Sequence, residues 1–502
     1  MPEHIRALVA VLVLGGLVFL LARPAMIRIV SQDTYVRWRR YWFITTAAWF
    51  LSHSFWIYVG VMALMLFRAG KREPHVFGLY LLLLMAAPQA QTPIPGFGIV
   101  DHIFMLDHYR LLSLALLLPC ALRLSRRATT ARLMSSPVDW MVLAYLVLNS
   151  LLAFRGGNFT SDARSALMGW IDLFLPYYVA SRSIQTAEGL RTALTGLVLG
   201  GLLLSILAAF EVLRRWKLYD AATAALGLNT FGAYKTRGPF VRPSVSAIDS
   251  IVLGYVIVVA TGAYLYLQSL VEDRSRRWML WGLLGTGVLA SLSRGPWVGA
   301  GVLLLVQMLT SPRPFKRLAQ GAAVSMLLLL LLSTTQMGQQ FINLLPFVGQ
   351  EEQGNVEYRA GLLTVSLPVI ERNILFGSWS FLKAPELQVM KQGEGIIDVV
   401  NSYLGVTLSM GLVGLIAFLG MFVSTLRFLR RGMRMARKTR NAEDLQQGRA
   451  LFAMLISIMF IIFTVSSILV VPTIYFAVIG ISCAYGLRLS TRSGEINRSV
   501  SA

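Results

Sequence analysis

Three arginines stand where their side chains could bind an anion at a membrane surface. Arg237 and Arg242 occupy segment 236–243, directly before an apolar run, and Arg294 occupies the minimal turn 292–295 between two apolar runs. A guanidinium is always charged and forms paired hydrogen bonds with phosphate oxygens. Arg294 has almost no loop to lift it from the bilayer. Its side chain therefore either reaches lipid phosphate along the apolar surface or meets an anionic ligand.

Carboxylates near these arginines in the sequence could act as proton acceptors. Asp249 lies just inside the apolar run that follows Arg242, where a carboxylate is costly, so it either pairs with a cation or takes part in chemistry. Asp398, Glu357 and Glu371 belong to a long polar stretch, in which each is either solvated surface or a general base.

Two tryptophans and one buried acid complete the set of candidates. Trp297 and Trp379 lie near these groups in the predicted arrangement, and indole rings stack on sugars. The other tryptophans are typical of an aromatic belt at the level of the lipid headgroups. Asp172, within the apolar run 166–181, is expected to be an internal hydrogen-bonding partner.

The sequence lacks the residues for several kinds of chemistry. All five histidines precede residue 109, which excludes a histidine metal site or a Ser/His dyad in the C-terminal half. No Walker-type phosphate loop is present, so ATP hydrolysis of that kind is excluded. Cys120 and Cys483 fall in apolar runs and predict no disulfide framework. We therefore expect no metal and no other cofactor.

The composition predicts that these side chains are carried by a membrane protein. Of 502 residues, 56% are hydrophobic and 14% are charged, whereas soluble domains carry about a quarter charged residues. A hydrocarbon core is crossed by ~20 helical residues. Fourteen apolar runs suit such spans, at 5–22, 42–67, 76–94, 109–122, 138–154, 166–181, 193–213, 247–270, 277–292, 296–310, 318–335, 402–426, 450–470 and 473–487. We predict an all-α polytopic membrane protein with about 12–14 transmembrane helices, of which 76–94 and 166–181 could be re-entrant.

Charge orients these spans. Basic residues cluster in four loops, at 123–132, 274–277, 313–317 and 427–449. Because Lys and Arg collect in cytoplasmic loops, this bias explains the formal net charge of +22 without nucleic acid as a partner. With these loops and the C-terminus inside, segments 214–246 and 292–295 and the long, partly helical loop 336–400 lie outside. That loop holds seven acidic and four basic residues, as expected for the outer side.

The N-terminal third fits this orientation less well. Segment 23–40 carries Arg23, Arg28, Arg37, Arg39 and Arg40, yet simple alternation of the fourteen runs places it outside. Either one early run does not span the membrane, or this segment is an interfacial helix. The sequence leaves both explanations open.

An ordered set of motifs resembles bacterial O-antigen ligases and O-antigen polymerases. The motifs are Arg237-Gly-x-Phe before a span, Ser291-x-Ser-Arg294-Gly, Tyr358-Arg359 leading to Asn373-Ile-Leu-Phe-Gly377, and Asn401-Ser-Tyr-Leu404 followed by Met410-Gly411-Leu-Val-Gly414-Leu. They cover roughly residues 160–470 in the order expected of that family.

The resemblance implies a metal-independent, inverting glycosyl transferase that uses an undecaprenyl-pyrophosphate-linked glycan as donor. It implies that Arg237 and Arg294 contact the pyrophosphate. We assign substrate-binding roles to a further set, namely Arg242, Arg359, Asn401, Tyr403, Trp297 and Asp249. The partners it implies are the lipid-linked glycan, membrane lipids, and a chain-length regulator with other polysaccharide-assembly proteins. The expected location is the cell inner membrane, with the site facing the periplasm.

One position departs from the family pattern. Ligases commonly carry a histidine directly before the asparagine of Asn-x-Tyr-Leu, where it is thought to activate the acceptor hydroxyl, and this chain has Val400 there. Valine accepts no proton, so Asp398, two residues away, becomes our candidate catalytic base. We predict polymerisation of lipid-linked repeat units for exopolysaccharide or O-antigen. The alternatives are a ligase that transfers glycan to lipid A–core or another acceptor, and a flippase or transporter of lipid-linked sugars.

These observations divide the chain into five regions. They are N-terminal spans at 1–160, a core membrane region with arginine-bearing loops at 161–335, the large outer loop at 336–400, C-terminal spans at 401–488 and a cytoplasmic tail at 489–502.

Overall fold

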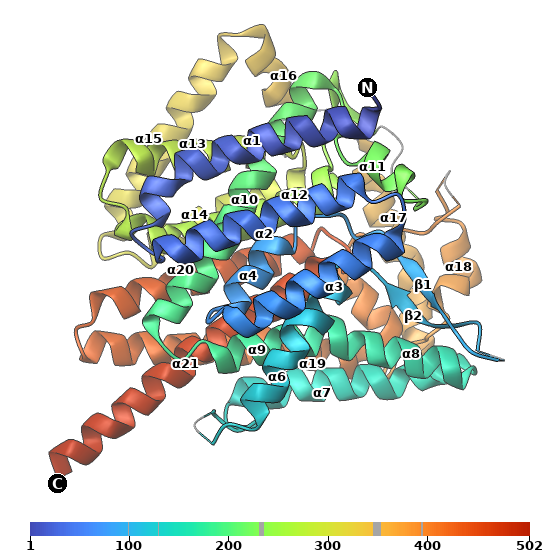
Figure 1. Ribbon diagram of the computed structural model, residues 1–502. Helices are drawn as coiled ribbons and strands as arrows, with labels where there is room; N and C mark the ends of the chain where they lie inside the picture. The colour runs from blue at the N-terminus through green and yellow to red at the C-terminus, as the bar shows by residue number, and fades with distance from the viewer. Residues whose placement is uncertain (99, 129, 230–234, 345–352, 393–394, 502) are drawn as a thin grey trace.

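The apolar runs form helices, many of which lie side by side (Figure 1). In lipid, each backbone N–H and C=O group must find its partner within the segment, which favours the α-helix. The computed structural model describes all residues except 99, 129, 230–234, 345–352, 393–394 and 502. Three acids of the long loop, Glu351, Glu352 and Glu394, therefore lie outside the described residues.

The N-terminal region consists of seven helices and one hairpin. They are α1 (Glu3–Met26), α2 (Gln32–Leu51), α3 (Phe55–Arg72), α4 (Val76–Leu83), β1 (Thr92–Pro95), β2 (His102–Leu106), α5 (His108–Leu112), α6 (Leu118–Ser125) and α7 (Pro137–Ala153). Strands β1 and β2 pair antiparallel, with Thr92 opposite Leu106. A π-helical turn, Ser113–Leu117, joins α5 to α6.

The middle region extends from α8 to α15. Its elements are α8 (Phe159–Gly169), α9 (Leu175–Ser183), α10 (Ala187–Arg214), α11 (Asp220–Ala225), β3 (Thr236–Arg237), β4 (Phe240–Val241), α12 (Ser250–Leu267), α13 (Arg274–Ala290), α14 (Arg294–Leu309) and α15 (Pro314–Ser333). The C-terminal region follows with α16 (Gln336–Leu344), α17 (Gln353–Arg372), α18 (Pro385–Gln388), α19 (Ser402–Lys438), α20 (Ala442–Ile462) and α21 (Val471–Ser501).

Eight helices in the described part of the chain are long and apolar enough to cross a membrane. They are Glu3–Met26, Pro137–Gly156, Ala187–Arg214, Ser250–Leu270, Pro314–Leu331, Ser402–Lys438, Ala442–Ile462 and Val471–Arg492. Each coincides with an apolar run of the sequence. Helix α14 is apolar but has only 16 residues. The chain is an all-α, multi-pass membrane protein, as predicted; length and composition by themselves identify eight of the 12–14 expected spans.

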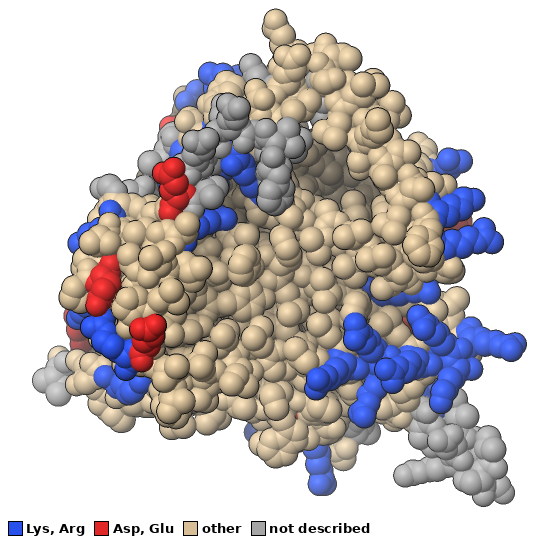
Figure 2. All heavy atoms as spheres, turned by 180° about the vertical axis from the view of Figure 1, so that it is seen from behind, with Lys and Arg blue, Asp and Glu red and all other residues tan. Residues whose placement is uncertain are grey.

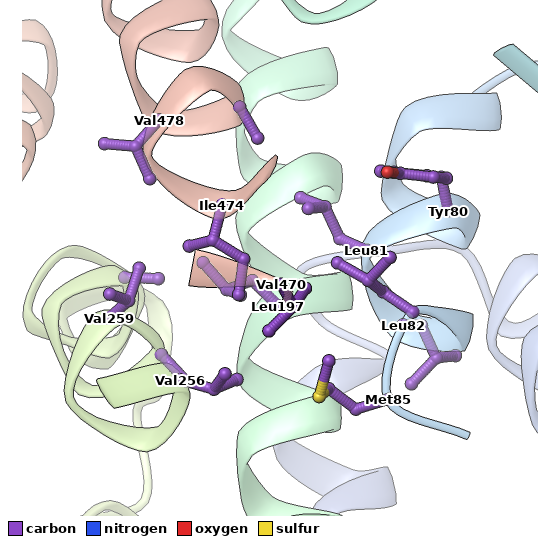
Figure 3. Close-up of a cluster of buried hydrophobic side chains, with 14 of the residues drawn as sticks. Tyr80, Leu81, Leu82, Met85, Leu197, Val256, Val259, Val470, Ile474 and Val478 are labelled. Atoms are coloured by element: carbon purple, nitrogen blue, oxygen red, sulfur yellow. The ribbon is translucent and has the colours of Figure 1, made fainter. Parts of the chain in front are cut away.

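The interior of the bundle is apolar and centred on α10 and α12. Figure 3 shows Leu81 and Leu82 of α4 facing Leu197 of α10, with Val256 of α12 and Ile474 of α21 on the other side. All five side chains are buried. Since lipid tails are as apolar as these side chains, the contacts add shape complementarity and dispersion rather than a large hydrophobic gain.

The basic loops meet at one end of the molecule, here called the basic end. Glu443 at the start of α20 forms an ion pair with Arg191 at the start of α10, 2.6 Å apart, and accepts a hydrogen bond from Tyr266 at the end of α12. Arg182, at the end of α9, donates to the carbonyl of Arg132. Figure 2 shows a large group of Lys and Arg side chains at one end, while the other end carries Asp and Glu together with further Lys and Arg.

In the N-terminal third, the apolar run 42–67 belongs to two helices rather than one. Helices α2 and α3 are separated at Ser52–Ser54 and run antiparallel, since Arg37 near the start of α2 pairs with Glu73 at the end of α3. Arg28, in segment 23–40, forms an ion pair with Glu272 at the basic end, so this segment lies with the other basic loops.

The two weak runs differ from each other. Run 76–94 is helical only to Leu83 and then leads to the β1–β2 hairpin. Run 166–181 lies within a helix that is continuous from α8 to α9 through a π-helical turn, Trp170–Phe174. Asp172 in this turn accepts hydrogen bonds from Arg110 at 2.9–3.2 Å, which confirms it as an internal partner.

Candidate functional site

A cavity of about 230 Å³ lies at the end opposite the basic loops, here called the cavity end. Side chains from four separate parts of the sequence line it. They are Lys235, Arg237, Arg242, Asp249 and Ile251; Ser293, Arg294 and Gly295; Tyr358, Arg359, Gln392, Asp398 and Val400; and Thr464. All three segments that the charge pattern places outside therefore meet at one cavity.

A two-stranded hairpin brings the first cations to the cavity. Arg237 of β3 pairs with Phe240 of β4, and the backbone N–H of Arg242 donates to the carbonyl of Lys235 at 2.9 Å. Gly238 makes the turn with a φ of +53°, which a residue with a Cβ rarely adopts. This short hairpin places Lys235, Arg237 and Arg242 around the same space.

The buried carboxylate of Glu211 anchors the loop that carries this hairpin. It lies near the end of α10 and is fully buried. Its oxygens accept the backbone N–H groups of Leu218 at 2.8 Å, Ser244 at 2.9 Å and Val245 at 3.0 Å. Charged acceptors form the stronger kind of hydrogen bond, so Glu211 ties both ends of the loop to α10.

The turn between α13 and α14 is joined directly to the hairpin. Arg237 donates through Nη1 to the carbonyl of Leu292, a residue with a φ of +48°. Arg294 is the first residue of α14, and its Nε donates to the carbonyl of Leu344 in α16 at 3.1 Å. Its side chain therefore lies between the cavity and the start of the long loop.

Helix α17 supplies the last cation and closes one side of the cavity. Arg359 is exposed, and its Nη2 donates to the carbonyl of Thr464 after α20 at 3.4 Å. The residue before it, Tyr358, donates through its hydroxyl to the backbone carbonyl of Asp398 at 3.2 Å. These contacts link the long loop to the segment between α20 and α21.

One carboxylate of the cavity has a single hydrogen-bond donor among the described residues. Oδ1 of Asp398 accepts a hydrogen bond from the hydroxyl of Ser466 at 2.7 Å. No donor from the described part of the chain contacts its Oδ2. Asp398 is half-buried and lines the cavity together with Val400.

Asp249, the second carboxylate, has a structural contact as well. It is the N-cap of α12, and its Oδ1 accepts the backbone N–H of Ile251 at 2.6 Å. Such a cap satisfies a backbone donor that the first helical turn leaves open. The capping contact explains why an acid stands at the start of this span, while the side chain still lines the cavity.

The electrostatics of the cavity favour an anion with several charges. Five cationic side chains line it, on Lys235, Arg237, Arg242, Arg294 and Arg359, against the two carboxylates, a formal excess of three positive charges. Helices α12, α14 and α19 each begin within two residues of a lining residue. Their N-terminal N–H groups add a positive partial charge at the same place.

Comparison with known proteins bears on part of the chain. Residues 278–419 match the family model of the O-antigen ligases. The matched segment contains Arg294, Arg359 and Asp398 of the cavity. It confirms the resemblance to the O-antigen ligase/polymerase superfamily and supports a function of that general type, whose members are glycosyltransferase-like enzymes. A search of curated proteins found no match to the chain.

Two glycine motifs of the family segment hold the long loop to α19. Gly411 interrupts this helix with a φ of +66°, and a Cβ there would collide with the carbonyl of Leu375. The interruption lets the N–H of Leu412 donate to Ile374 at 2.8 Å, while Ser378 donates to the carbonyl of Leu408 at 2.8 Å. These motifs are therefore structural.

Several predicted site residues are not brought to the cavity. Asn401 is the N-cap of α19, where its side chain accepts the N–H groups of Tyr403 and Leu404. The hydroxyl of Tyr403 donates to the carbonyl of Met459 at 2.8 Å. Trp297 is buried, and its indole donates to the carbonyl of Val288 at 2.7 Å. Asn401 therefore caps its own helix, while Tyr403 and Trp297 each join one helix to another.

The remaining candidates are also outside the cavity lining. Trp379 is 44% exposed, and Glu357 and Glu371 are exposed on α17. Conversely, the sequence interpretation missed Lys235 and Ser466, the serine whose hydroxyl donates a hydrogen bond to Asp398. Lys235 stands two residues before Arg237, so strand alternation could have placed both on one face. For Ser466, which is distant in sequence, no signal was available.

Proposed function

We propose that this chain polymerises oligosaccharide repeat units carried on undecaprenyl pyrophosphate, at the periplasmic face of the inner membrane. The observation that carries the proposal is the cavity that five cations share with Asp398, a carboxylate whose Oδ2 has no donor among the described residues. A chain-length regulator and other polysaccharide-assembly proteins are the partners that such a reaction would require.

In this proposal Arg237 and Arg294 hold the pyrophosphate of the donor, with Arg242 and Arg359 beside them. As the bond between the anomeric carbon and the phosphate oxygen breaks, negative charge on the leaving pyrophosphate rises. Cations and helix N-termini that are already in place stabilise that charge more than they stabilise the ground state. The hydrogen bond from Arg237 to Leu292 holds the hairpin against the turn that carries Arg294.

Asp398 takes the proton of the acceptor hydroxyl. The acceptor oxygen forms a new bond to the anomeric carbon, the pyrophosphate leaves with the bonding electrons, and the proton passes to Oδ2 of the carboxylate. Ser466 fixes the other oxygen and so orients the group. The position where ligases carry histidine is Val400, which also lines the cavity, so the carboxylate lies next to the place of the missing base.

The family match favours one rival, because its description is that of an O-antigen ligase. In that case the acceptor is lipid A–core or another molecule rather than a second lipid-linked repeat. The cation-lined cavity would serve both reactions equally. The two differ only in the acceptor.

Product analysis separates the candidates. Purified protein in proteoliposomes is given undecaprenyl-pyrophosphate-linked repeats, with and without lipid A–core, and the glycans are sized. A ladder of longer lipid-linked glycans is expected. Transfer only onto lipid A–core would identify a ligase. Unchanged length with altered sidedness would identify a flippase, and both results would refute the polymerase.

A further inference from the structure

A second cavity, at the basic end, combines an apolar wall with a cationic rim. It measures about 690 Å³ and lies between α6 and the helix that contains α9. Its apolar lining comes from Leu118, Ala121, Leu122, Leu124, Leu133, Phe174, Leu175 and Tyr178. Leu118 and Leu122 are 37% and 52% exposed, so the wall opens to the surroundings of the bundle.

The cationic rim has no partner among the residues that the structure describes. It consists of Arg126, Arg127 and Arg132. In the described parts of the chain, none of these three side chains donates a hydrogen bond or forms an ion pair. Thr130 also lines the cavity and is only 8% exposed, yet its hydroxyl has no hydrogen-bond partner among the described residues. A buried hydroxyl without a partner is costly, which indicates a ligand at this position.

A neighbouring cavity continues the positive surface. It measures about 360 Å³ and shares Leu124 and Arg127 with the first cavity. Its other cationic lining residues are Lys71, Arg72 and Arg123. Its acid, Glu73, is already engaged by Arg37 at 3.3 Å. Two cationic cavities thus lie on either side of Arg127.

We infer that these two cavities together bind an anionic phospholipid with two phosphate groups, from the leaflet at the basic end. One phosphate lies among Arg126, Arg127 and Arg132, and it accepts a hydrogen bond from the hydroxyl of Thr130. The second lies beside Lys71 and Arg72. The acyl chains follow the apolar wall along α6. This wall favours a lipid over a free phosphate, because it would remain uncovered with an inorganic ion. Basic pockets between spans at the cytoplasmic side bind such headgroups.

The test measures lipid occupancy on the purified, full-length protein by native mass spectrometry. The probes are cardiolipin with two phosphates, phosphatidylglycerol with one and neutral phosphatidylcholine. The variant Arg126→Gln/Arg127→Gln/Arg132→Gln should bind cardiolipin about tenfold or more weakly, since each surface arginine contributes a severalfold factor. The control Arg427→Gln/Arg434→Gln/Arg437→Gln removes three exposed arginines from α19 at the same end and should bind within about twofold of the unchanged protein.

The variant Thr130→Val provides a further test that does not depend on net charge, because it keeps every charge and removes only the buried hydroxyl. It should lower cardiolipin occupancy by about threefold, with phosphatidylcholine unaffected. Equal losses in the two triple variants would reduce the effect to surface charge and overturn the site. Equal binding of phosphatidylglycerol and cardiolipin would overturn the two-phosphate assignment. Displacement by millimolar inorganic phosphate would overturn the lipid in favour of the free anion. None of these outcomes bears on the proposed polymerase reaction.

Discussion

Glu211→Gln should separate the arginine-bearing hairpin from the helix that supports it. The carboxylate accepts three backbone N–H groups, one from Leu218 at the start of the loop and two from Ser244 and Val245 at its end. Glutamine has one acceptor oxygen, and its NH₂ group would face backbone donors. The variant therefore keeps one side of the anchor and loses the other.

The size of the effect follows from these bonds. A hydrogen bond to a charged group contributes about 1.5–3 kcal/mol, so losing one or two of them costs about 2–5 kcal/mol. That energy acts locally on the loop that carries Arg237 and Arg242. Because about 1.4 kcal/mol is a tenfold change, we expect polymer formation to fall by about thirtyfold or more. The protein should still insert, since the apolar face of α10 is unchanged.

The assay combines activity with protection of the loop. Polymer formation is measured in proteoliposomes, and trypsin cleavage after Lys235 is followed in parallel. Cleavage should be faster in Glu211→Gln. Glu443→Gln is the matched control, because it breaks a carboxylate contact with Arg191 at the basic end, far from the cavity. It should retain both normal activity and normal protection.

The reasoning would be refuted if Glu211→Gln polymerised at the control's rate with its loop still protected. A drop in activity in both variants would mean that general destabilisation, and not the anchor, limits the reaction.

Further changes test the site, the glycine motif and the topology. Arg294→Ala should abolish polymer formation, by at least about a hundredfold in sizing gels, because it removes a cation from the leaving pyrophosphate. Asp398→Asn should slow turnover by about a hundredfold or more in the same assay, since an amide takes no proton. Gly411→Ala should lower the melting temperature strongly, through a penalty of about 3 kcal/mol or more from its positive φ and the clash with Leu375. A membrane-impermeant maleimide should label Asp33→Cys from the basic side and His53→Cys from the cavity side, because α2 and α3 are separate helices.

Each of these changes has a result that would contradict it. Retained activity in Arg294→Ala would remove pyrophosphate binding from its role. A near-normal rate in Asp398→Asn would place the base elsewhere. Labelling of residues 33 and 53 from the same side would mean that α2 does not cross the membrane, and no labelling of residue 53 would restore a single span at 42–67. The native Cys120 and Cys483 are buried, which keeps the background of that assay low.

The sequence by itself determined the class of the protein and the chemistry of its outer loops. The free energy of transferring a segment into lipid depends mainly on the residues of that segment, so it can be estimated from a short window of sequence. For that reason eight of the expected spans, and the gathering of the basic loops at one end, followed from composition and charge. The same charge argument singled out Arg237, Arg242 and Arg294, and all three line the cavity.

Only the tertiary structure decided which of the candidates meet. Trp297 and Tyr403 are as close to the arginine motifs in sequence as residues that line the cavity, but both side chains turn into helix contacts. Ser466 reaches Asp398 across 68 residues of sequence, because α20 returns the chain to the cavity end. Hydropathy gives no information on which face of a helix packs against which neighbour. That choice depends on the shapes of all the contacting side chains, and it determines which charged groups surround the cavity.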